Sequence, residues 1–505
     1  MSSTELMQRK FITKKNLKFL KWFQLTKINK TLLITGTFFM LFEFAELTQK
    51  YCLSPKCNET ANRILQEMDP NIEPCEDFYQ YACGGWDKKN ILKPSQNYTS
   101  KFYKLEKNIE AKLFDIIQLW NETKNTTKKK AYSYYDSCMN EDERYNNHKG
   151  KDALLKFIKE LGNTSLLGEA FATISDFRFS LETSFTKFFF PCFIEVDLRM
   201  LNSSKAMIQI KLSKASWLDY KSNKLVIEKI DKIQEYLLFS DFLPNETLVQ
   251  HLLDDLELNS NSYFGNNLIL RKFHKLYYYN LLRHPDRFQI FVYDTYPFAV
   301  NIFYFDVSNS IYLPTSMTEK PMFDLERSMS LTFGGIAFYI AHMISYSFDS
   351  YDVDFDAFGN QKKILTNASI SKYKEMSECF VQQYEKFKFH GENVNGKTTM
   401  SVNIADIVGL EIAYNAYKTW VDENGAHPLY PTLDLHDNQL VFLGMAQYYC
   451  YKSTKEFAID RIVKSGHAPQ PTRVRGSIQN SKDFAKAFNC KPNSQMNPTK
   501  KCSIL

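Results

Sequence analysis

A long apolar segment carries the first residue with metal-binding chemistry. From Leu331 to Phe348 the chain is apolar nearly all round, which predicts a helix buried at the centre of a large domain. Near its end stands His342, with Met343 beside it and Tyr346 four residues later. In the H-E-x-x-H motif, two histidines at that spacing share one helix face and bind zinc, and the glutamate activates a metal-bound water. Only the first histidine is present here, so the segment alone also fits a core helix with one satisfied histidine.

Further residues with site chemistry follow this helix. Asp406 ends the run N-I-A-D, and Val402 stands directly before that run. His467 and Arg473 come later still. Two interpretations of Asp406 remain open, because its carboxylate suits either a hydrogen bond from His342 or a structural cap.

The surrounding pattern predicts a mainly helical protein with a small sheet, an α+β fold. The aromatic and β-branched segment 298–307, a turn at 308–310 and the short segment 311–313 predict a strand pair. Helical spacing recurs over 104–119, 400–420 and 438–450, whereas 206–212 is β-rich in composition.

Length and composition fit a large folded protein. The 505 residues suffice for two or three domains, and 44% apolar with 15% aromatic residues excludes disorder as the default. The net charge of +6 gathers largely in a basic tail at residues 1–30, which argues against nucleic-acid binding. The following segment, 31–48, predicts a signal-anchor with its basic end in the cytoplasm. A cleaved signal peptide and a plain core helix are the alternatives.

Cysteines and glycosylation sequons point to export. All 10 cysteines follow residue 48, as expected for disulfides in an oxidising compartment. Cys502-Ser-Ile-Leu505 also reads as a prenylation box, but prenylation is cytosolic, and the N-terminal segment sends this end outside the cytosol. The N-x-S/T sequons lie at Asn58, Asn97, Asn121, Asn125, Asn163, Asn202, Asn245 and Asn367.

Two longer blocks identify a family. The run P-C-E-D-F-Y-Q-Y-A-C-G-G-W occupies 74–86, and a second block runs from Tyr430 to the end. With them, the chain resembles the neprilysin family of zinc metallopeptidases, strongly over 52–140 and 298–505 and faintly between. The resemblance implies a thermolysin-like zincin lobe plus a truncated helical lid lobe. It divides the chain into a region with a shortened lid at 52–297 and a metallopeptidase-like domain at 298–505.

The resemblance also implies that the zinc site is degenerate. His342 matches the first zinc histidine, but Met343 replaces the catalytic glutamate and Tyr346 the second histidine. Val402 stands where the family has its third ligand, a glutamate. Because a catalytic zinc normally keeps three protein ligands, we expect no metal cofactor, although active family members use zinc.

Other positions of the family site are retained. Asp406 matches the aspartate that orients a ligand histidine, His467 the residue that stabilises the oxyanion, and Arg473 the residue that grips a substrate carbonyl. Asn301 matches the edge-strand asparagine that binds substrate backbone, with Ile302 in place of the usual alanine. This strand is either an open edge able to accept a peptide or a plain hairpin.

The family's cysteine pairing carries over in part. By resemblance, the pairs are Cys52–Cys57, Cys75–Cys490, Cys83–Cys450 and Cys379–Cys502. The usual partner of Cys138 lies in the missing part of the lid. Cys192 is left over, so Cys138–Cys192 is the new pair that we predict.

We therefore predict a catalytically inactive neprilysin-like ectodomain, a peptide-binding or regulatory protein that captures extracellular peptides or pairs with an active relative. We place it at the plasma membrane as a single-pass type II protein, or alternatively as a secreted one. The alternative function is a zinc endopeptidase with a non-standard site completed by Tyr346 or Asp349. A third hypothesis is a decaying duplicate with no role beyond its fold.

Overall fold

The computed structural model describes residues 51–140, 190–238, 246–283, 298–324, 327–349 and 355–505. The predicted basic tail and signal-anchor lie outside these residues. Among the helices that are described, none is both long enough and apolar enough to cross a membrane. The contacts divide the chain into two compact units, residues 1–61 with 428–434 and residues 62–427 with 435–505.

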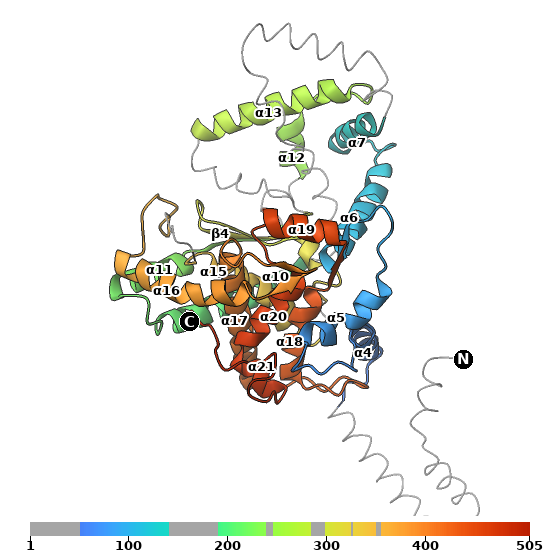
Figure 1. Ribbon diagram of the computed structural model, residues 1–505. Coiled ribbons are helices and arrows are strands. Elements are labelled where there is room, and N and C mark those ends of the chain that lie inside the picture. The colour runs from blue at the N-terminus through green and yellow to red at the C-terminus, as the bar shows by residue number, and fades with distance from the viewer. Residues whose placement is uncertain (1–50, 141–189, 239–245, 284–297, 325–326, 350–354) are drawn as a thin grey trace, which may run out of the picture. The chain divides into compact units, whose positions relative to one another are not determined.

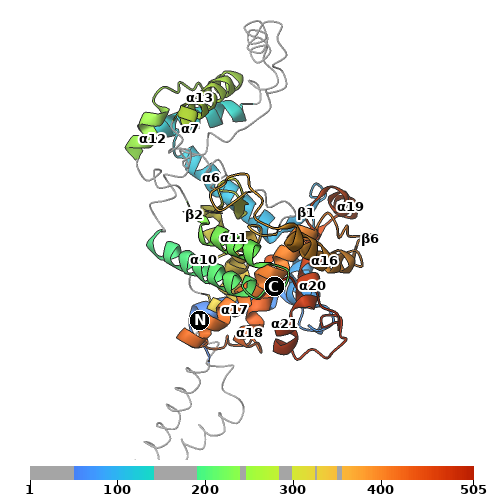
Figure 2. The ribbon, with the colours of Figure 1, turned by 90° about the vertical axis from the view of Figure 1, so that its left-hand side faces the viewer.

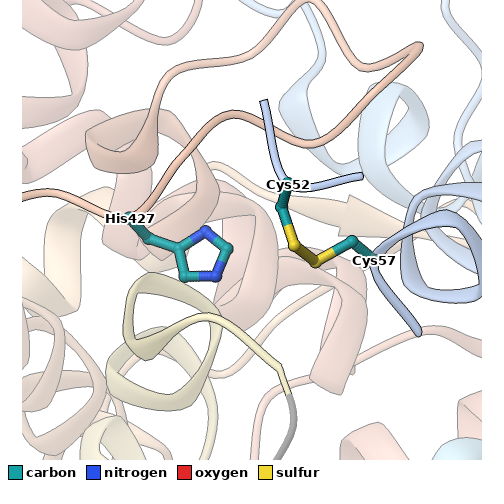
Figure 3. Close-up of side chains that lie close together, drawn as sticks. All are labelled: Cys52, Cys57 and His427. Carbon is teal, nitrogen blue, oxygen red and sulfur yellow. A yellow bond between two sulfur atoms is a disulfide. The ribbon is translucent and has the colours of Figure 1, made fainter. Parts of the chain in front are cut away.

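The described part of the first unit is small. Tyr51 forms a parallel bridge with Leu429, and the amide of Cys52 donates a 2.9 Å hydrogen bond to the carbonyl of Leu429. Cys52 and Cys57 form a disulfide (Figure 3). Since both sulfur atoms are oxidised, neither cysteine offers a thiolate to a metal ion.

The predicted central helix is present in the second unit, in three consecutive pieces. They are the α-helix α14 (Met329–Thr332), the π-helical turn η6 (Phe333–Ala337) and the α-helix α15 (Phe338–Ser345). All the residues of η6 and α15 are buried, as the all-round apolar sequence predicts. Single π-turns inside helices are frequent next to functional sites, and this one directly precedes the helix that carries His342.

Two further helices frame this central helix. Long α17 (Met400–Asn424) lies along α15, and α18 (Asp437–Tyr448) lies along α14 and η6 (Figure 1). The close approach of α17 to α15 requires a glycine at position 409. A Cβ atom on Gly409 would stand 2.9 Å from the backbone carbonyl oxygen of Phe338 and 3.0 Å from the backbone nitrogen of His342. The missing side chain at Gly409 therefore lets α17 reach the helix of His342.

The predicted strand pair is also confirmed, in shorter form. Strands β3 (Phe303–Phe305) and β4 (Ser310–Pro314) are antiparallel, with Tyr304 opposite Ile311. A third strand, β2 (Gln234–Leu238), joins β4 in parallel and gives the order β2-β4-β3. Within the described residues, β3 is thus an edge strand. Two-stranded antiparallel sheets pair β1 (Tyr98–Ser100) with β7 (Tyr451–Ser453), and β5 (Lys388–Phe389) with β6 (Glu392–Asn393).

One expectation from composition was wrong. The β-rich segment 206–212 is the last part of a helix, α10 (Phe190–Leu212). Ile208 and Leu212, four residues apart, are fully buried on one side, whereas Ile210 is 51% exposed. Apolar and polar residues alternate in this segment as they would in a strand. The segment is nevertheless helical, because Ile208 and Leu212 share the buried face and Ile210 points outward.

The described part of the chain contains further helices, many of which are labelled in Figures 1 and 2. Distal helices α7, α12 and α13 share a small apolar cluster of Tyr134, Leu253, Leu256 and Leu270. The bounds are α4 (Pro55–Glu67), α5 (Phe78–Lys89), α6 (Lys101–Gln118), α7 (Thr126–Met139), α11 (Tyr220–Asp231), α12 (Glu246–Leu253), α13 (Tyr263–Arg283), η5 (Thr315–Thr318), α16 (Asn367–Tyr384), α19 (Lys455–Lys464), α20 (Gln470–Asn480) and α21 (Lys482–Ala487).

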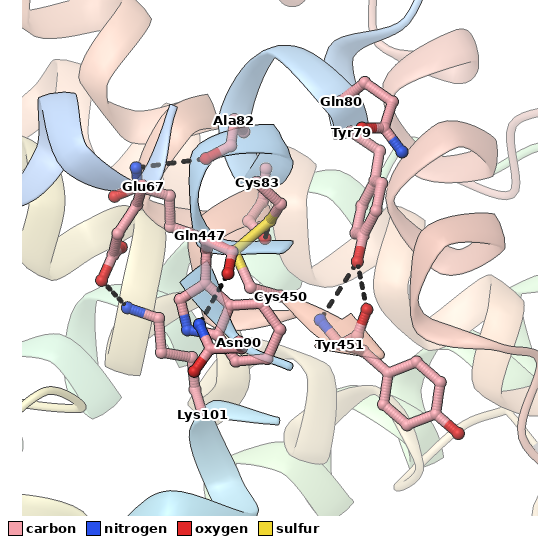
Figure 4. The surroundings of a disulfide bond; sticks show 12 residues. Glu67, Tyr79, Gln80, Ala82, Cys83, Asn90, Lys101, Gln447, Cys450 and Tyr451 are labelled. Atoms are coloured by element: carbon pink, nitrogen blue, oxygen red, sulfur yellow. Dashed lines mark hydrogen bonds and ion pairs between the residues drawn. A yellow bond between two sulfur atoms is a disulfide. The ribbon is translucent and has the colours of Figure 1, made fainter. Parts of the chain in front are cut away.

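Disulfides join distant parts of the second unit. Cys75 bonds to Cys490, Cys83 to Cys450 and Cys379 to Cys502, which are the pairs that the family resemblance implies. Around the Cys83–Cys450 bond, the side chain of Gln447 donates a 3.3 Å hydrogen bond to the Ala82 carbonyl (Figure 4). Closing loops of more than 100 residues contributes about 4–5 kcal/mol per bond in the chain-entropy model.

The predicted Cys138–Cys192 pair is not found. Cys138 is free, and the side chain of Cys192 lies outside the described residues. The two cysteines belong to different surroundings, because Cys138 is near the end of α7, which packs against α6, α12 and α13. Cys192 is on α10, which packs against α11, α15 and α17.

The close approach at Gly409 can be tested by adding a methyl group. We expect Gly409→Ala to lower the free energy of unfolding by about 1–3 kcal/mol, because the new Cβ overpacks α15 against α17. Chemical denaturation measures the change. Gly466→Ala is the matched control, since its Cβ would meet only the Thr398 carbonyl oxygen at 3.9 Å and should shift stability by less than about 0.5 kcal/mol. Equal effects of the two substitutions would contradict the packing argument.

Candidate functional site

His342 and Tyr346 face each other at the end of the central helix. His342 is 1% exposed and lies one turn before Tyr346, the C-cap residue of α15. The Tyr346 hydroxyl lies 3.2 Å from Nε2 of His342, and the two rings meet edge to face at 86°. Burial raises the pKa of Tyr346 well above its usual value, so the phenol keeps its proton and donates to Nε2.

Asp406 is the charged centre of the site. It lies on α17 and is fully buried. Arg473 of α20 donates two hydrogen bonds of 2.7 Å to its carboxylate, from Nε to Oδ2 and from Nη2 to Oδ1. Tyr449 donates a third bond of 3.1 Å to Oδ1, and the Arg473 guanidinium lies 4.5 Å from the centre of the Tyr449 ring.

The charges of this cluster balance. Burial alone would raise the pKa of Asp406, but the Arg473 charge and the hydrogen bonds outweigh it and lower that pKa, so the carboxyl is ionised. Nδ1 of His342 lies 2.9 Å from Oδ1 of Asp406. That contact is electrostatic rather than a well-aligned hydrogen bond, because Nδ1 has no partner of good hydrogen-bond geometry. Burial lowers the pKa of His342 despite the carboxylate, so the imidazole is neutral near pH 7.

Apolar residues stand at two further positions that the sequence analysis singled out. Met343 is 7% exposed and Val402 is 8% exposed, and neither side chain carries a zinc ligand. Asp349 accepts hydrogen bonds on both carboxylate oxygens, one from the Tyr373 hydroxyl and one of 2.5 Å from the Ser401 hydroxyl. Burial raises the pKa of Asp349 to about 7, although these bonds oppose the shift.

The groups at the site that could bind a metal ion are one neutral imidazole and carboxylates that already accept hydrogen bonds. Within the described residues, no group of three His, Cys, Asp or Glu side chains converges around His342 closely enough to hold a metal ion. The arrangement can hold a buried arginine–carboxylate pair and a histidine whose Nε2 is hydrogen-bonded to Tyr346 and whose Nδ1 lies beside the Asp406 carboxylate. Met343, the next residue in sequence after His342, has no titratable group and cannot act as a base.

A cavity of about 340 Å³ adjoins this cluster. Arg473 and Tyr449 line it from the site, and His467 lines it from the loop before α20. Asn301 lies just before β3 and does not line the cavity; its side-chain oxygen Oδ1 accepts a 2.6 Å hydrogen bond from the Tyr339 hydroxyl. The aromatic walls include Tyr98, Phe102, Tyr103, Tyr339, Tyr449 and Phe457.

The structure thus brings together some of the predicted residues and adds others. His342, Asp406 and Arg473 form one contact network, His467 shares only the cavity with Arg473, and buried Ile302 is not among the residues that line that cavity. Sequence reasoning missed Tyr449, which contacts both Asp406 and Arg473. Its position next to Cys450 was the available signal, because that cysteine was already placed by the disulfide pattern.

Comparisons with known proteins give the class. Two models described as peptidase family M13 match residues 74–212 and 301–504, which together exceed half of the chain. The chain therefore belongs to peptidase family M13, the family of zinc metallopeptidases that includes neprilysin and endothelin-converting enzyme.

Individual relatives agree with this assignment. Endothelin-converting enzyme 1 of Mus musculus is 34% identical over 301 residues, 59% of this chain and 39% of the relative. Neprilysin-3 of Drosophila melanogaster is 32% identical over 311 residues, 61% of this chain and 39% of the relative. The chain thus matches about two fifths of the length of these relatives.

Solved structures show the same fold at low identity. An inhibitor complex of the Mycobacterium tuberculosis zinc metalloprotease Zmp1 superposes with a TM-score of 0.63 at 14% identity, covering 87% of this chain and 99% of that one. A Haemonchus galactose-containing glycoprotein complex gives 0.67 at 17% identity, covering 90% and 100%. The predicted mainly helical fold with small sheets is confirmed.

The dependence of Asp406 on Arg473 is testable by unbalancing the pair. We expect Asp406→Asn to lower the free energy of unfolding by about 3–5 kcal/mol, since it leaves the Arg473 charge buried without a carboxylate. Adding Arg473→Met to Asp406→Asn should recover much of that loss, because it removes the orphaned charge. Denaturant titration of the three proteins measures both effects. If Asp406→Asn alone lowered the free energy of unfolding by less than about 1 kcal/mol, the argument from a buried ion pair would be contradicted.

Proposed function

We propose that this protein is a catalytically inactive member of peptidase family M13 that binds peptides without cutting them. The observation that carries the proposal is the hydrogen bond between the Tyr346 hydroxyl and Nε2 of His342. When a zinc-binding histidine turns one ring nitrogen to a carboxylate, the other nitrogen binds the metal. Here Nδ1 faces Asp406, and the nitrogen left for a metal holds a tyrosine hydroxyl instead.

The residues present do not fit a catalytic zinc. Such a site needs three protein ligands and an open position for water. His342 supplies one ligand, Tyr346 is a protonated phenol, and Val402 is a buried hydrocarbon. An isolated carboxylate left in this buried place without its metal would be costly, so apolar Met343 and Val402 are compatible with a fold that no longer contains the ion.

The rival zinc endopeptidase with altered ligands has less support. Tyr346 would have to lose a proton whose pKa burial has raised. Asp349 would have to give up its hydrogen bonds to Tyr373 and Ser401. Both changes oppose metal binding, whereas the observed contacts satisfy every one of these groups.

Peptide binding is supported by what the site retains. The cavity beside Arg473 is aromatic and of a size that suits a side chain or a short peptide segment. Within the described residues, Nη1 of Arg473 has no hydrogen-bond partner, because Asp406 takes only Nε and Nη2. That nitrogen remains a donor for a peptide carbonyl. Edge strand β3 can add main-chain hydrogen bonds to an extended ligand.

We further propose an extracellular location. Disulfides join distant parts of the second unit, and such bonds form in oxidising compartments. The segment 31–48 serves in this proposal as a signal-anchor of a type II membrane protein, with a secreted form as the alternative. The ligands are then extracellular peptides, and the partners include active members of the family.

The fate of a bound peptide tests this function. The purified chain should bind a fluorescent synthetic peptide with a central phenylalanine, and mass spectrometry should recover the peptide intact with or without zinc. Phe457→Ala should weaken binding by about tenfold, because Phe457 is a wall of the cavity. Phe358→Ala is the matched control, since Phe358 is 69% exposed and does not line the cavity.

A restored site provides the positive control for hydrolysis. The combined substitutions Met343→Glu, Tyr346→His and Val402→Glu return the residue types of the family motif, and this variant should gain zinc-dependent cleavage. Chelator-sensitive cleavage by the unaltered protein would refute the inactive reading. The binding role would be refuted if neither the unaltered protein nor the Phe457→Ala variant bound the peptide saturably.

A further inference from the structure

The cavity beside Arg473 has walls from two helices that meet at Tyr98. One wall is the start of α6, where the ring of Tyr103 meets the ring of Tyr98 edge to face, with the ring centres 5.2 Å apart. The other wall is α19, whose Phe457 stacks on Tyr98 at 4.9 Å with the ring planes 8° apart. One tyrosine ring of strand β1 thus contacts both helical walls of the cavity.

Each helical wall also carries one charged residue. On α6, Glu106 follows Tyr103 by three residues, and on α19, Arg461 follows Phe457 by four. Residues at these spacings lie on the same face of a helix, so each charge stands one turn beyond the aromatic residue of its wall. Glu106 and Arg461 both line the cavity, and both are exposed at its opening. The two walls therefore present opposite charges to one cavity.

The negative charge of Glu106 is not neutralised by its neighbours on α6. The ammonium group of Lys107 forms an ion pair of 2.6 Å with Glu110 instead. The ammonium group of Lys104 donates a hydrogen bond to the side-chain oxygen of Asn90. Among the described residues, no cation forms an ion pair with Glu106, so its carboxylate is available to a ligand.

The positive charge of Arg461 is likewise available on α19. The acidic neighbour Asp460 forms its ion pair with Lys464. Arg461 donates a 3.1 Å hydrogen bond from Nη2 to the hydroxyl of Ser465, and because that hydroxyl is neutral the charge of the guanidinium remains. In the part of the chain that the structure describes, no carboxylate is paired with Arg461.

The two other basic side chains of the cavity add no free charge. Arg473 donates both of its 2.7 Å hydrogen bonds to the carboxylate of Asp406, which balances it. Partial burial and, after it, the Arg473 charge lower the pKa of His467 to about 4, so this imidazole is neutral at pH 7. Among the described side chains that line the cavity, the free charges are thus one carboxylate and one guanidinium.

We propose that this cavity selects peptides in which an aromatic residue stands between a basic and an acidic residue, in one sequence order only. The inference rests on the proposed peptide-binding function and narrows its ligand. The aromatic side chain packs on Tyr98 and Phe457, the basic side chain lies beside Glu106, and the acidic side chain lies beside Arg461.

The selection of one order follows from the two different walls. A peptide whose direction is fixed by its main-chain contacts satisfies both charges in one order and meets like charges in the reverse order. Complementary charges of this kind contribute to specificity more than to affinity. A cavity of about 340 Å³ accommodates one large side chain together with parts of its two neighbours.

Fluorescence anisotropy with three capped and labelled pentapeptides tests the order. Each has a central phenylalanine, flanked by lysine and then aspartate in the first, by aspartate and then lysine in the second, and by alanine on both sides in the third. The first two share composition and net charge, so only a site with two separate charges distinguishes them. We expect one order to bind at least about fivefold more tightly than the other, and about 0.5 M salt to reduce the difference, because exposed charges are screened.

Exchanging the two charges should reverse the preference. Glu106→Arg with Arg461→Glu keeps the net charge of the chain, and the order that the unaltered protein disfavours should become the tighter one. Asp115→Arg with Lys455→Glu is the matched control, because these exposed residues lie on the same two helices and do not line the cavity. The control should keep the original ratio of affinities within about twofold. Circular dichroism checks that both variants are folded.

Equal affinity for the two charged orders, or a preference that the exchange of charges leaves in place, would overturn the inference. If all three peptides bind with equal affinity, the proposed peptide-binding function stands and the charge selection alone fails. If none of the three binds saturably, the proposed function fails and the inference fails with it.

Discussion

The carboxylate of Asp406 has no contact with solvent, and an ionised group in such a place needs a partner of opposite charge. Arg473 provides it through two hydrogen bonds of 2.7 Å, and Tyr449 covers the guanidinium. This single interaction fixes α17 to α20. With His342 2.9 Å from the same carboxylate, it also sets the position of α15. This one buried ion pair therefore links α17 to α20, with α15 in contact with it through His342.

Under the proposal that the zinc position is altered, that pair accounts for how the fold persists without the metal. In a zinc enzyme the metal is a large local charge that holds its ligands in place. Here Asp406 is balanced by Arg473 and His342 is neutral, so the cluster carries no net charge that a metal would have to offset. The Tyr346 hydroxyl completes the hydrogen bonding of the imidazole. The proposal of a binding protein without hydrolysis rests on that hydrogen bond, and the charge balance of the cluster is consistent with it.

The positions of the central helices could be predicted from the sequence, because the pattern of apolar residues reflects which side chains are buried. The apolar run 331–348 could only be a buried helix, and 400–420 and 438–450 showed helical spacing on long elements. The disulfides between distant cysteines followed from the family resemblance and not from spacing. The predicted match of His342 to a zinc histidine likewise comes only from the blocks that flank the helix, and it stays a prediction.

The features that sequence missed depend on tertiary contacts. Segment 206–212 alternates like a strand, yet Ile208 and Leu212 are buried together on a helix that packs on α15 and α17. The π-turn η6 has no apolar periodicity that would distinguish it in the sequence from the α-helices on either side. Tyr449 contacts Asp406 across 43 residues of sequence, a pairing that no local pattern records. The free Cys138 shows the same limit, since counting unpaired cysteines ignores which helices pack together.

The central claim is that the nitrogen of His342 that would hold zinc is occupied by the Tyr346 hydroxyl. Metal analysis by mass spectrometry tests it most directly, after the purified chain has been dialysed against micromolar zinc and then against metal-free buffer at neutral pH. We predict zinc well below one atom per chain, unchanged by His342→Ala. One tightly held zinc per chain, lost when His342 is replaced by alanine, would contradict the account.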